Sequence, residues 1–132
     1  MSKIIIASGP VIIEDGKVLL DKSGDDLFWK FCGGKVKDED AGLRATTKRR
    51  AREELGIEIK IINPEPFLMH TLKETPEGNI DVILVHYLAK RIGEIKPGAD
   101  IREWKFIPLA DLVKEDLAPN IILTLKHFKF LE

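Results

Sequence analysis

The chain has 132 residues, of which 44% are apolar and 33% are charged, and its net charge at pH 7 is −1. This composition is typical of one folded domain, and it excludes a disordered tail, a collagen-like repeat and a mini-protein scaffold. The near-neutral charge argues against a globally basic, nucleic-acid-binding protein. Because Cys32 is the only cysteine, no intrachain disulfide can form, which favours a reducing compartment.

The first apolar stretch, residues 4–13, is interrupted by Ser8, Gly9 and Pro10. It is much shorter than the ~20 residues that span a bilayer. No signal-peptide cleavage region precedes the next charged residues. We therefore expect a cytoplasmic protein with no membrane partner.

Strands dominate the first third of the chain. Apolar runs predict strands at residues 4–6, 11–13 and 18–20. The pair Asp15-Gly16 is a hairpin-turn signal between the last two of these. The alternating residues 29–31 predict another short strand, which leads into Gly33-Gly34.

Residues 41–55 contain good helix formers and no proline, so they predict a helix, with Gly56 at its C-terminal end. Further strands are predicted at residues 57–61, 67–73, 80–88 and 104–107. The tail predicts a short helix at residues 109–113 and a last helix that starts near Pro119. A helix between strands indicates one α/β (α+β) domain over residues 1–132, with a central mixed sheet and flanking helices.

The segment with the clearest chemistry is residues 33–57, GGKVKDEDAGLRATTKRRAREELGI. Its glycine pair lets a backbone approach a ligand closely. The carboxylates of Glu53 and Glu54 at the end of the helix can hold a hard divalent cation. Such a cation neutralises phosphate charge and activates water, so the segment predicts phosphate chemistry.

This segment resembles the signature of the Nudix hydrolase superfamily in a degenerate, MutT-like form. The signature runs Gly, five residues, Glu, seven residues, and then Arg-Glu-apolar-x-Glu-Glu-x-Gly-apolar. Its second half is matched by Arg49, Ala51, Glu53, Glu54, Gly56 and Ile57. Gly33-Gly34-Lys35-Val36 resembles the glycine-rich opening, and residues 100–109 resemble a later acidic segment followed by an aromatic-apolar strand.

The resemblance implies a Nudix α/β/α sandwich and a Mg²⁺-dependent pyrophosphohydrolase, with Mn²⁺ as the alternative cation. Water would attack a phosphorus of a nucleoside diphosphate linked to another group, most often of a nucleoside triphosphate. A homodimer is compatible with the family, and no nucleic-acid partner is expected.

The resemblance also assigns roles to individual residues. Glu53 and Glu54 would hold the metal and serve catalysis, together with a remote carboxylate, for which Asp100 matches the family position better than Glu103. Gly33, Gly34 and Lys35 of the glycine-rich opening would bind phosphate. Arg50 is a phosphate-binding candidate by its own chemistry, because a guanidinium binds phosphate bidentately. Arg49 would brace the loop through either Glu39 or Asp40, and Gly56 would end the helix.

Three departures from the signature matter. Arg50 stands where the signature has a metal-ligand Glu, and at ~100° per helical residue it projects between Glu53 and Glu54. We expect it to pair with both carboxylates and to oppose cation binding. The first half of the signature is one residue too long, and Cys32 replaces the usual Pro, although a free Cys is often only a small buried hydrophobe.

Arg50 motivates a second hypothesis, a catalytically weak or inactive Nudix-fold module that binds a nucleotide or a protein. An Arg can bind phosphate bidentately without metal. The basic run at residues 48–52 resembles a nucleic-acid patch, but acidic residues follow at once, and a salt-bridged surface is the simpler interpretation. The three histidines lack metal-ligand spacing, and Trp29, Phe31 and Phe67 fit either core packing or stacking on a base.

Overall fold

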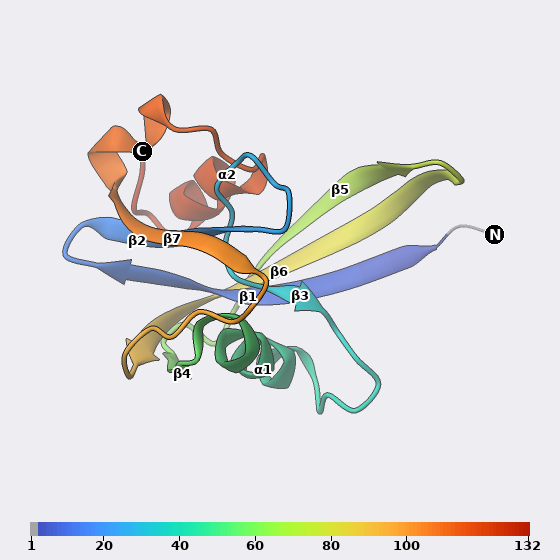
Figure 1. Ribbon diagram of the computed structural model, residues 1–132, viewed down its shortest axis with the longest axis horizontal. Helices are drawn as coiled ribbons and strands as arrows, with labels where there is room; N and C mark the ends of the chain where they lie inside the picture. Colours follow the sequence, from blue (N-terminus) through green and yellow to red (C-terminus); the bar gives the residue numbers. More distant parts are fainter. Residues whose placement is uncertain (1–2) are drawn as a thin grey trace.

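The computed structural model describes residues 3–132, which form a mixed seven-stranded sheet with helices on both sides (Figure 1). The strands are β1 (Ile4–Glu14), β2 (Lys17–Ser23), β3 (Gly34–Lys35), β4 (Glu58–Ile61), β5 (Phe67–Thr75), β6 (Gly78–Ile92) and β7 (Ile101–Pro108). The helices are α1 (Leu43–Leu55), the 3₁₀ helix η1 (Leu109–Lys114) and α2 (Asn120–His127). This arrangement confirms the predicted fold class.

The strands follow the order β4-β6-β1-β2-β7, with β3 beside β1 and β5 beside β6. The β1–β6 pair is parallel, and the other pairs are antiparallel. Figure 1 shows α1 against one face of the sheet and α2 on the other, while β5, β6 and the start of β1 extend beyond both helices.

The alternation of side chains along the central strands builds one core on each face of the sheet. Val11 faces the core under α2, and its neighbour Ile12 faces the core under α1. In β2 the same alternation sends Leu20 to the α2 side and Leu19 to the α1 side. Asp21, two residues after Leu19, is therefore expected on the α1 side, where the candidate site lies.

Helix α1 starts two residues later than predicted, at Leu43 rather than at residue 41. Gly42 has φ 103°, which is not helical, and this glycine turns the chain into the helix. The predicted C-terminal end is confirmed, because Gly56 adopts the left-handed conformation at φ 65°.

Two strand predictions were wrong in detail. Residues 4–13 form one continuous strand because β1 pairs with β6 through Gly9 and Pro10. The predicted strand at residues 29–31 is instead two isolated bridges. Trp29 bonds the backbone of residues 116–118 on one side, whereas Lys30 bonds Asp21 on the other, so no continuous partner exists.

The glycine-rich loop, residues 32–34, is positioned by β1, because the two backbones cross in close contact. A Cβ atom at Gly9 would collide with the carbonyl of Cys32, and one at Gly33 would lie 2.9 Å from the Ser8 carbonyl oxygen. Glycine at both positions lets the loop rest directly on β1. None of the helices in residues 3–132 is long and apolar enough to cross a membrane.

Candidate functional site

Arg49 connects the loop to helix α1. Its guanidinium donates to both carboxylate oxygens of Asp40 at 2.9 and 3.0 Å, and to the Lys35 carbonyl at 2.9 Å. It also donates to both oxygens of Glu53 at 3.0 Å. Of the two candidate partners, Asp40 makes the contact, whereas Glu39 is exposed. Hydrogen bonds from the Arg49 guanidinium and then from the Lys37 backbone N–H hold the pKa of the Asp40 carboxyl well below its usual range.

Arg50 lies between the two glutamates, as its helical position predicts. It donates to Glu53 Oε2 at 2.8 Å and to Glu54 Oε1. Its guanidinium also packs on Gly34, where any Cβ atom would collide with Arg50 Nε. Gly34 therefore leaves space for the Arg50 side chain. The positive charge beside Glu53 and Glu54 comes from this guanidinium.

Glu53 and Glu54 have different surroundings. The Glu53 side chain is 43% exposed, and hydrogen bonding from Arg49 lowers its pKa. The Glu54 side chain is only 7% exposed, and its Oε2 atom is buried with no hydrogen-bond partner. A buried carboxylate oxygen without a partner is costly, so Glu54 is the more available of the two for a further cation.

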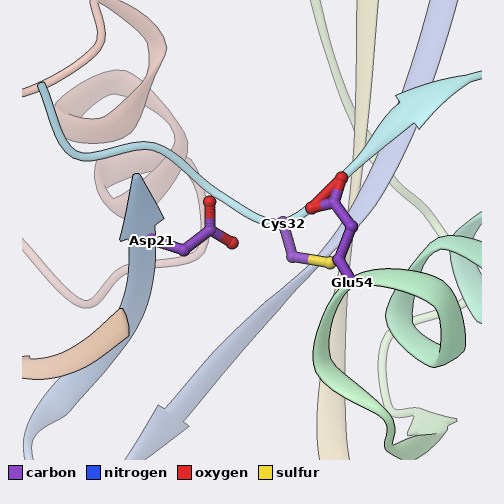
Figure 2. Close-up of side chains that lie close together, drawn as sticks. All are labelled: Asp21, Cys32 and Glu54. Atoms are coloured by element: carbon purple, nitrogen blue, oxygen red, sulfur yellow. The ribbon is translucent and has the colours of Figure 1, made fainter. Parts of the chain in front are cut away.

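Asp21 and Cys32 lie beside Glu54 and complete a buried cluster (Figure 2). One possible ligand atom from each residue lies within 4.8 Å of the other two. Asp21 Oδ1 is also buried without a partner. Burial, followed by the nearby Glu54, raises the pKa of Asp21 to about 7. Burial also raises the pKa of the Cys32 thiol.

A pocket of about 340 Å³ lies between the glycine-rich loop, residues 32–34, and the start of α2. It is lined by Phe28, Phe31, His86, Asn120 and the residues of the loop from Cys32 to Gly34. The Asn120 side-chain amide contacts His86 Nε2 at 2.7 Å, and the rings of Phe31 and His86 lie 4.8 Å apart. Burial lowers the pKa of His86 to about 4, so the imidazole is neutral at pH 7.

Asp100 is exposed in the segment that connects β6 to β7. Within that segment, Gly98 donates its backbone N–H to the Glu54 carbonyl at 2.8 Å, which ties the segment to the helix end. The Asp100 carboxylate makes no hydrogen bond or ion pair with any residue in the described range 3–132.

The structure thus brings the loop residues 33–35 together with Arg49, Arg50, Glu53 and Glu54. Sequence reasoning missed Asp21, His86 and Asn120 as site residues. A signal for Asp21 existed, since two-residue periodicity puts it on the α1 face with Leu19. No comparable signal pointed to Asn120, because its pocket is assembled by α2 and β6, which are distant in sequence.

The chain is similar in sequence and in fold to known proteins. The model of the NUDIX domain family matches residues 5–128. The solution structure of the E. coli ORF135 protein is 27% identical, with TM-score 0.70 over 96% of this chain and 89% of that chain. The MutT NUDIX hydrolase from Burkholderia pseudomallei is 22% identical, with TM-score 0.78 over 95% of this chain and 98% of that chain.

A third solved structure contains a bound ligand. The NUDIX domain of Shewanella oneidensis NrtR, in complex with ADP ribose, is 18% identical, with TM-score 0.70 over 98% of this chain and 87% of that chain. No curated protein matches the chain. The family model covers nearly the whole sequence, and it includes the loop, the helix and the pocket described above. The chain belongs to the NUDIX domain family.

Proposed function

We propose that this chain is a divalent-cation-dependent pyrophosphohydrolase of nucleoside diphosphate–X compounds, with nucleoside triphosphates as the preferred substrates. One observation carries the proposal. The same short loop, Gly33-Gly34, lines the pocket and contacts Arg50 beside Glu53 and Glu54. A nucleotide lying across this loop would have its base in the pocket and its phosphates at the helix end.

The pocket suits a nucleobase. Phe28 and Phe31 offer aromatic rings, and the Asn120 amide offers hydrogen-bonding groups near the pocket wall. An apolar pocket with a few polar groups is the usual form of a small-molecule site. Its volume of about 340 Å³ lies in the range of such sites.

The part of the site proposed for the phosphates consists of backbone groups and positively charged side chains. Gly33 and Gly34 allow a phosphate to approach the main chain, and Lys35 adds positive charge beside them. The Arg50 guanidinium can exchange a carboxylate for a phosphate, since both accept the same bidentate hydrogen bonds. Substrate binding would then draw Arg50 away from Glu53 and Glu54.

The residues present fit a divalent cation, because the buried Glu54 Oε2 has no partner. Glu54 would hold Mg²⁺ or Mn²⁺, and Glu53 would join it once Arg50 turns to the phosphates. A cation bound there would neutralise charge on the diphosphate bridge and lower the pKa of the attacking water. The chain's own residues would orient the substrate: Arg49 holds the loop to the helix, and Gly56 ends the helix beside Glu54.

Asp100 is the proposed remote carboxylate that accepts the proton of the attacking water. Its exposed side chain is unpaired within residues 3–132, and its segment is tied to the end of α1 through Gly98. We further propose a cytoplasmic enzyme of the 132-residue domain, with a nucleotide as its partner and no nucleic acid or membrane.

A second candidate function follows from Arg50 itself. Because Arg50 pairs with both glutamates, it takes hydrogen-bonding positions that a cation would otherwise use. The chain would then bind a nucleotide or a protein with little or no hydrolysis. Arg50 would contact the phosphates directly, without metal.

The two candidates are separated by turnover of a nucleotide panel, measured with Mg²⁺, with Mn²⁺ and with EDTA. Release of phosphate and pyrophosphate follows the triphosphates, and chromatography of the nucleotide products follows the compounds that release neither. The panel contains canonical and oxidised nucleoside triphosphates, dinucleoside polyphosphates and ADP-ribose, the ligand in the NrtR structure. Metal-dependent turnover supports the enzyme. Nucleotide-induced thermal stabilisation in EDTA, without turnover in any arm, supports the binding module.

Glu54→Gln tests the site within that assay. It should reduce turnover at least about a hundredfold, the lower range for loss of a group that acts on the transition state. Glu58→Gln is the matched control, because Glu58 is an exposed glutamate that pairs with Arg52 outside the site. Unchanged turnover in Glu54→Gln would remove Glu54 from the catalytic residues.

A further inference from the structure

Three donor atoms from separate parts of the chain meet in the protein interior. Asp21 comes from β2, Cys32 from the loop that precedes Gly33, and Glu54 from the last turn of α1 (Figure 2). Their possible ligand atoms all lie within 4.8 Å of one another, and the three residues are 1%, 4% and 6% exposed. The fold therefore brings two carboxylates and a thiol to one buried point.

Two oxygen atoms of this cluster have no hydrogen-bond partner in residues 3–132. Asp21 Oδ1 and Glu54 Oε2 are buried, and neither makes a hydrogen bond within the described part of the chain. Figure 2 shows the Asp21 carboxylate pointing from β2 toward the loop at Cys32. Burying such oxygens without a partner is unfavourable, and a cation between them would supply the missing interactions.

The charges match a divalent cation. Burial keeps a proton on the Cys32 thiol and, near pH 7, partly on Asp21, so a cation that binds here displaces these protons into solvent. The three ionised donors and the neighbouring Arg50 guanidinium then carry two net negative charges, which one divalent cation neutralises. Arg50 occupies Glu54 Oε1, and the other oxygen, Oε2, is free. Arg50 and a cation can therefore share the same carboxylate.

The sulfur atom decides which cation fits. Mg²⁺ takes oxygen ligands almost exclusively, whereas a thiolate favours Zn²⁺ and similar first-row ions. Three protein ligands also leave a fourth tetrahedral position open, as in catalytic zinc sites. Cys32 lines the pocket as well, so the cluster borders the space proposed for the nucleotide.

We propose that Asp21, Cys32 and Glu54 form a binding site for one thiophilic divalent cation of the Zn²⁺ or Co²⁺ type. This site differs in its donors from the oxygen-only site that Glu53 and Glu54 would offer to Mg²⁺. It shares Glu54 with the proposed catalytic site and so rests on the proposed function for its role in hydrolysis. Cation binding itself requires no substrate and no turnover.

The test is a Co²⁺ titration of the tag-free, reduced protein without nucleotide, followed by absorption spectroscopy. The expected result is saturation at one Co²⁺ per chain, with thiolate-to-cobalt charge-transfer absorption in the near ultraviolet. One equivalent of Zn²⁺ should remove the signal, whereas a hundredfold excess of Mg²⁺ should not. Cys32→Ser should abolish the charge-transfer band, and Asp21→Asn should weaken Co²⁺ binding at least tenfold.

Asp25→Asn is the matched control, because Asp25 is an exposed acid in the loop that follows β2. It should bind Co²⁺ as the parent does. The parent's own thermal unfolding gives a readout that needs no variant, since Zn²⁺ at one equivalent should raise the Tm and Mg²⁺ at the same concentration should not.

The proposal is overturned if saturating Co²⁺ gives no charge-transfer band, if the band persists in Cys32→Ser, or if Asp25→Asn loses it equally. Nucleotide turnover is measured on the same preparation. Turnover without the cobalt band overturns this inference and leaves the proposed function standing. The band without turnover under any cation overturns the proposed enzyme and leaves the thiophilic site standing.

Discussion

Arg50 donates to one carboxylate oxygen of Glu54, while the second oxygen, Oε2, is buried without a partner. The guanidinium reaches this position because Gly34, on which it packs, has no side chain. At position 50, helix α1 of this NUDIX domain therefore has a positively charged guanidinium, where the family signature has a glutamate. Half of the Glu54 carboxylate is still available to a second cation.

Arg50→Glu is expected to strengthen Mg²⁺ binding about tenfold, on the order of 1.4 kcal/mol, and to raise Mg²⁺-dependent turnover. The substitution removes the positive charge that pairs with Glu53 and Glu54 and adds an oxygen donor. Without metal, repulsion between the introduced carboxylate and those of Glu53 and Glu54 should lower the Tm. Calorimetric titration with Mg²⁺ measures the affinity, and Arg52→Glu, which changes an exposed arginine on the same helix, is the control. Affinity equal to that of the parent would contradict this account of Arg50.

Asp40→Asn should destabilise the loop between Gly34 and α1. The Asp40 carboxylate accepts hydrogen bonds from Arg49, the Lys37 backbone N–H and the Thr46 hydroxyl, and an amide cannot accept all of them. We expect a lower Tm and lower turnover. The neighbouring Glu39→Gln should resemble the parent, because Glu39 is exposed. Equal effects of the two substitutions, measured by thermal unfolding and steady-state kinetics, would refute Asp40 as the partner of Arg49.

Asn120→Ala should raise the KM for the nucleotide about tenfold, the usual range for losing one or two hydrogen bonds, with little change in kcat. Asn120 lines the pocket proposed for the base and lies away from Glu53 and Glu54. Preference among bases should weaken at the same time. Asn79→Ala, at the exposed start of β6, serves as control. An unchanged KM and base preference would place the nucleotide elsewhere.

The pH dependence of stability should contain a contribution from His86. Burial lowers its pKa from 6.5 to about 4, so between these pH values the unfolded chain binds a proton here that the folded chain does not. The contribution is fully present above pH 6.5 and is lost as the pH falls, by on the order of 3 kcal/mol at pH 4.

Urea unfolding of the parent and of His86→Gln across this range isolates the effect, because other titrating groups cancel in the difference. Asn79→Ala, an exposed substitution that changes no titrating group, should follow the parent profile. Parallel profiles for the parent and His86→Gln would show that His86 does not titrate as described.

Most of the fold could be predicted from local patterns. Short runs of apolar and β-branched residues identified most of the strands, and Gly56 identified the end of α1, because these signals depend only on neighbouring residues. The errors occurred where the outcome depended on distant partners. Residues 29–31 lack a continuous strand because their backbone bonds different segments on its two sides. Pro10 lies inside β1 because β6 pairs with β1 continuously from Ile4 to Ile12.

The same division applies to the site. The sequence by itself determined the Nudix signature, the position of Arg50 between two glutamates and the choice of Glu39 or Asp40, since helical geometry and spacing are local. Only the tertiary structure selected Asp40 and brought Asp21 and Cys32 to Glu54. It also assembled the pocket from α2, β6 and the glycine-rich loop. Except for the pairing of Asp40 with Arg49, these contacts join residues far apart in the chain, and only the packing of helices against both faces of the sheet brings them together.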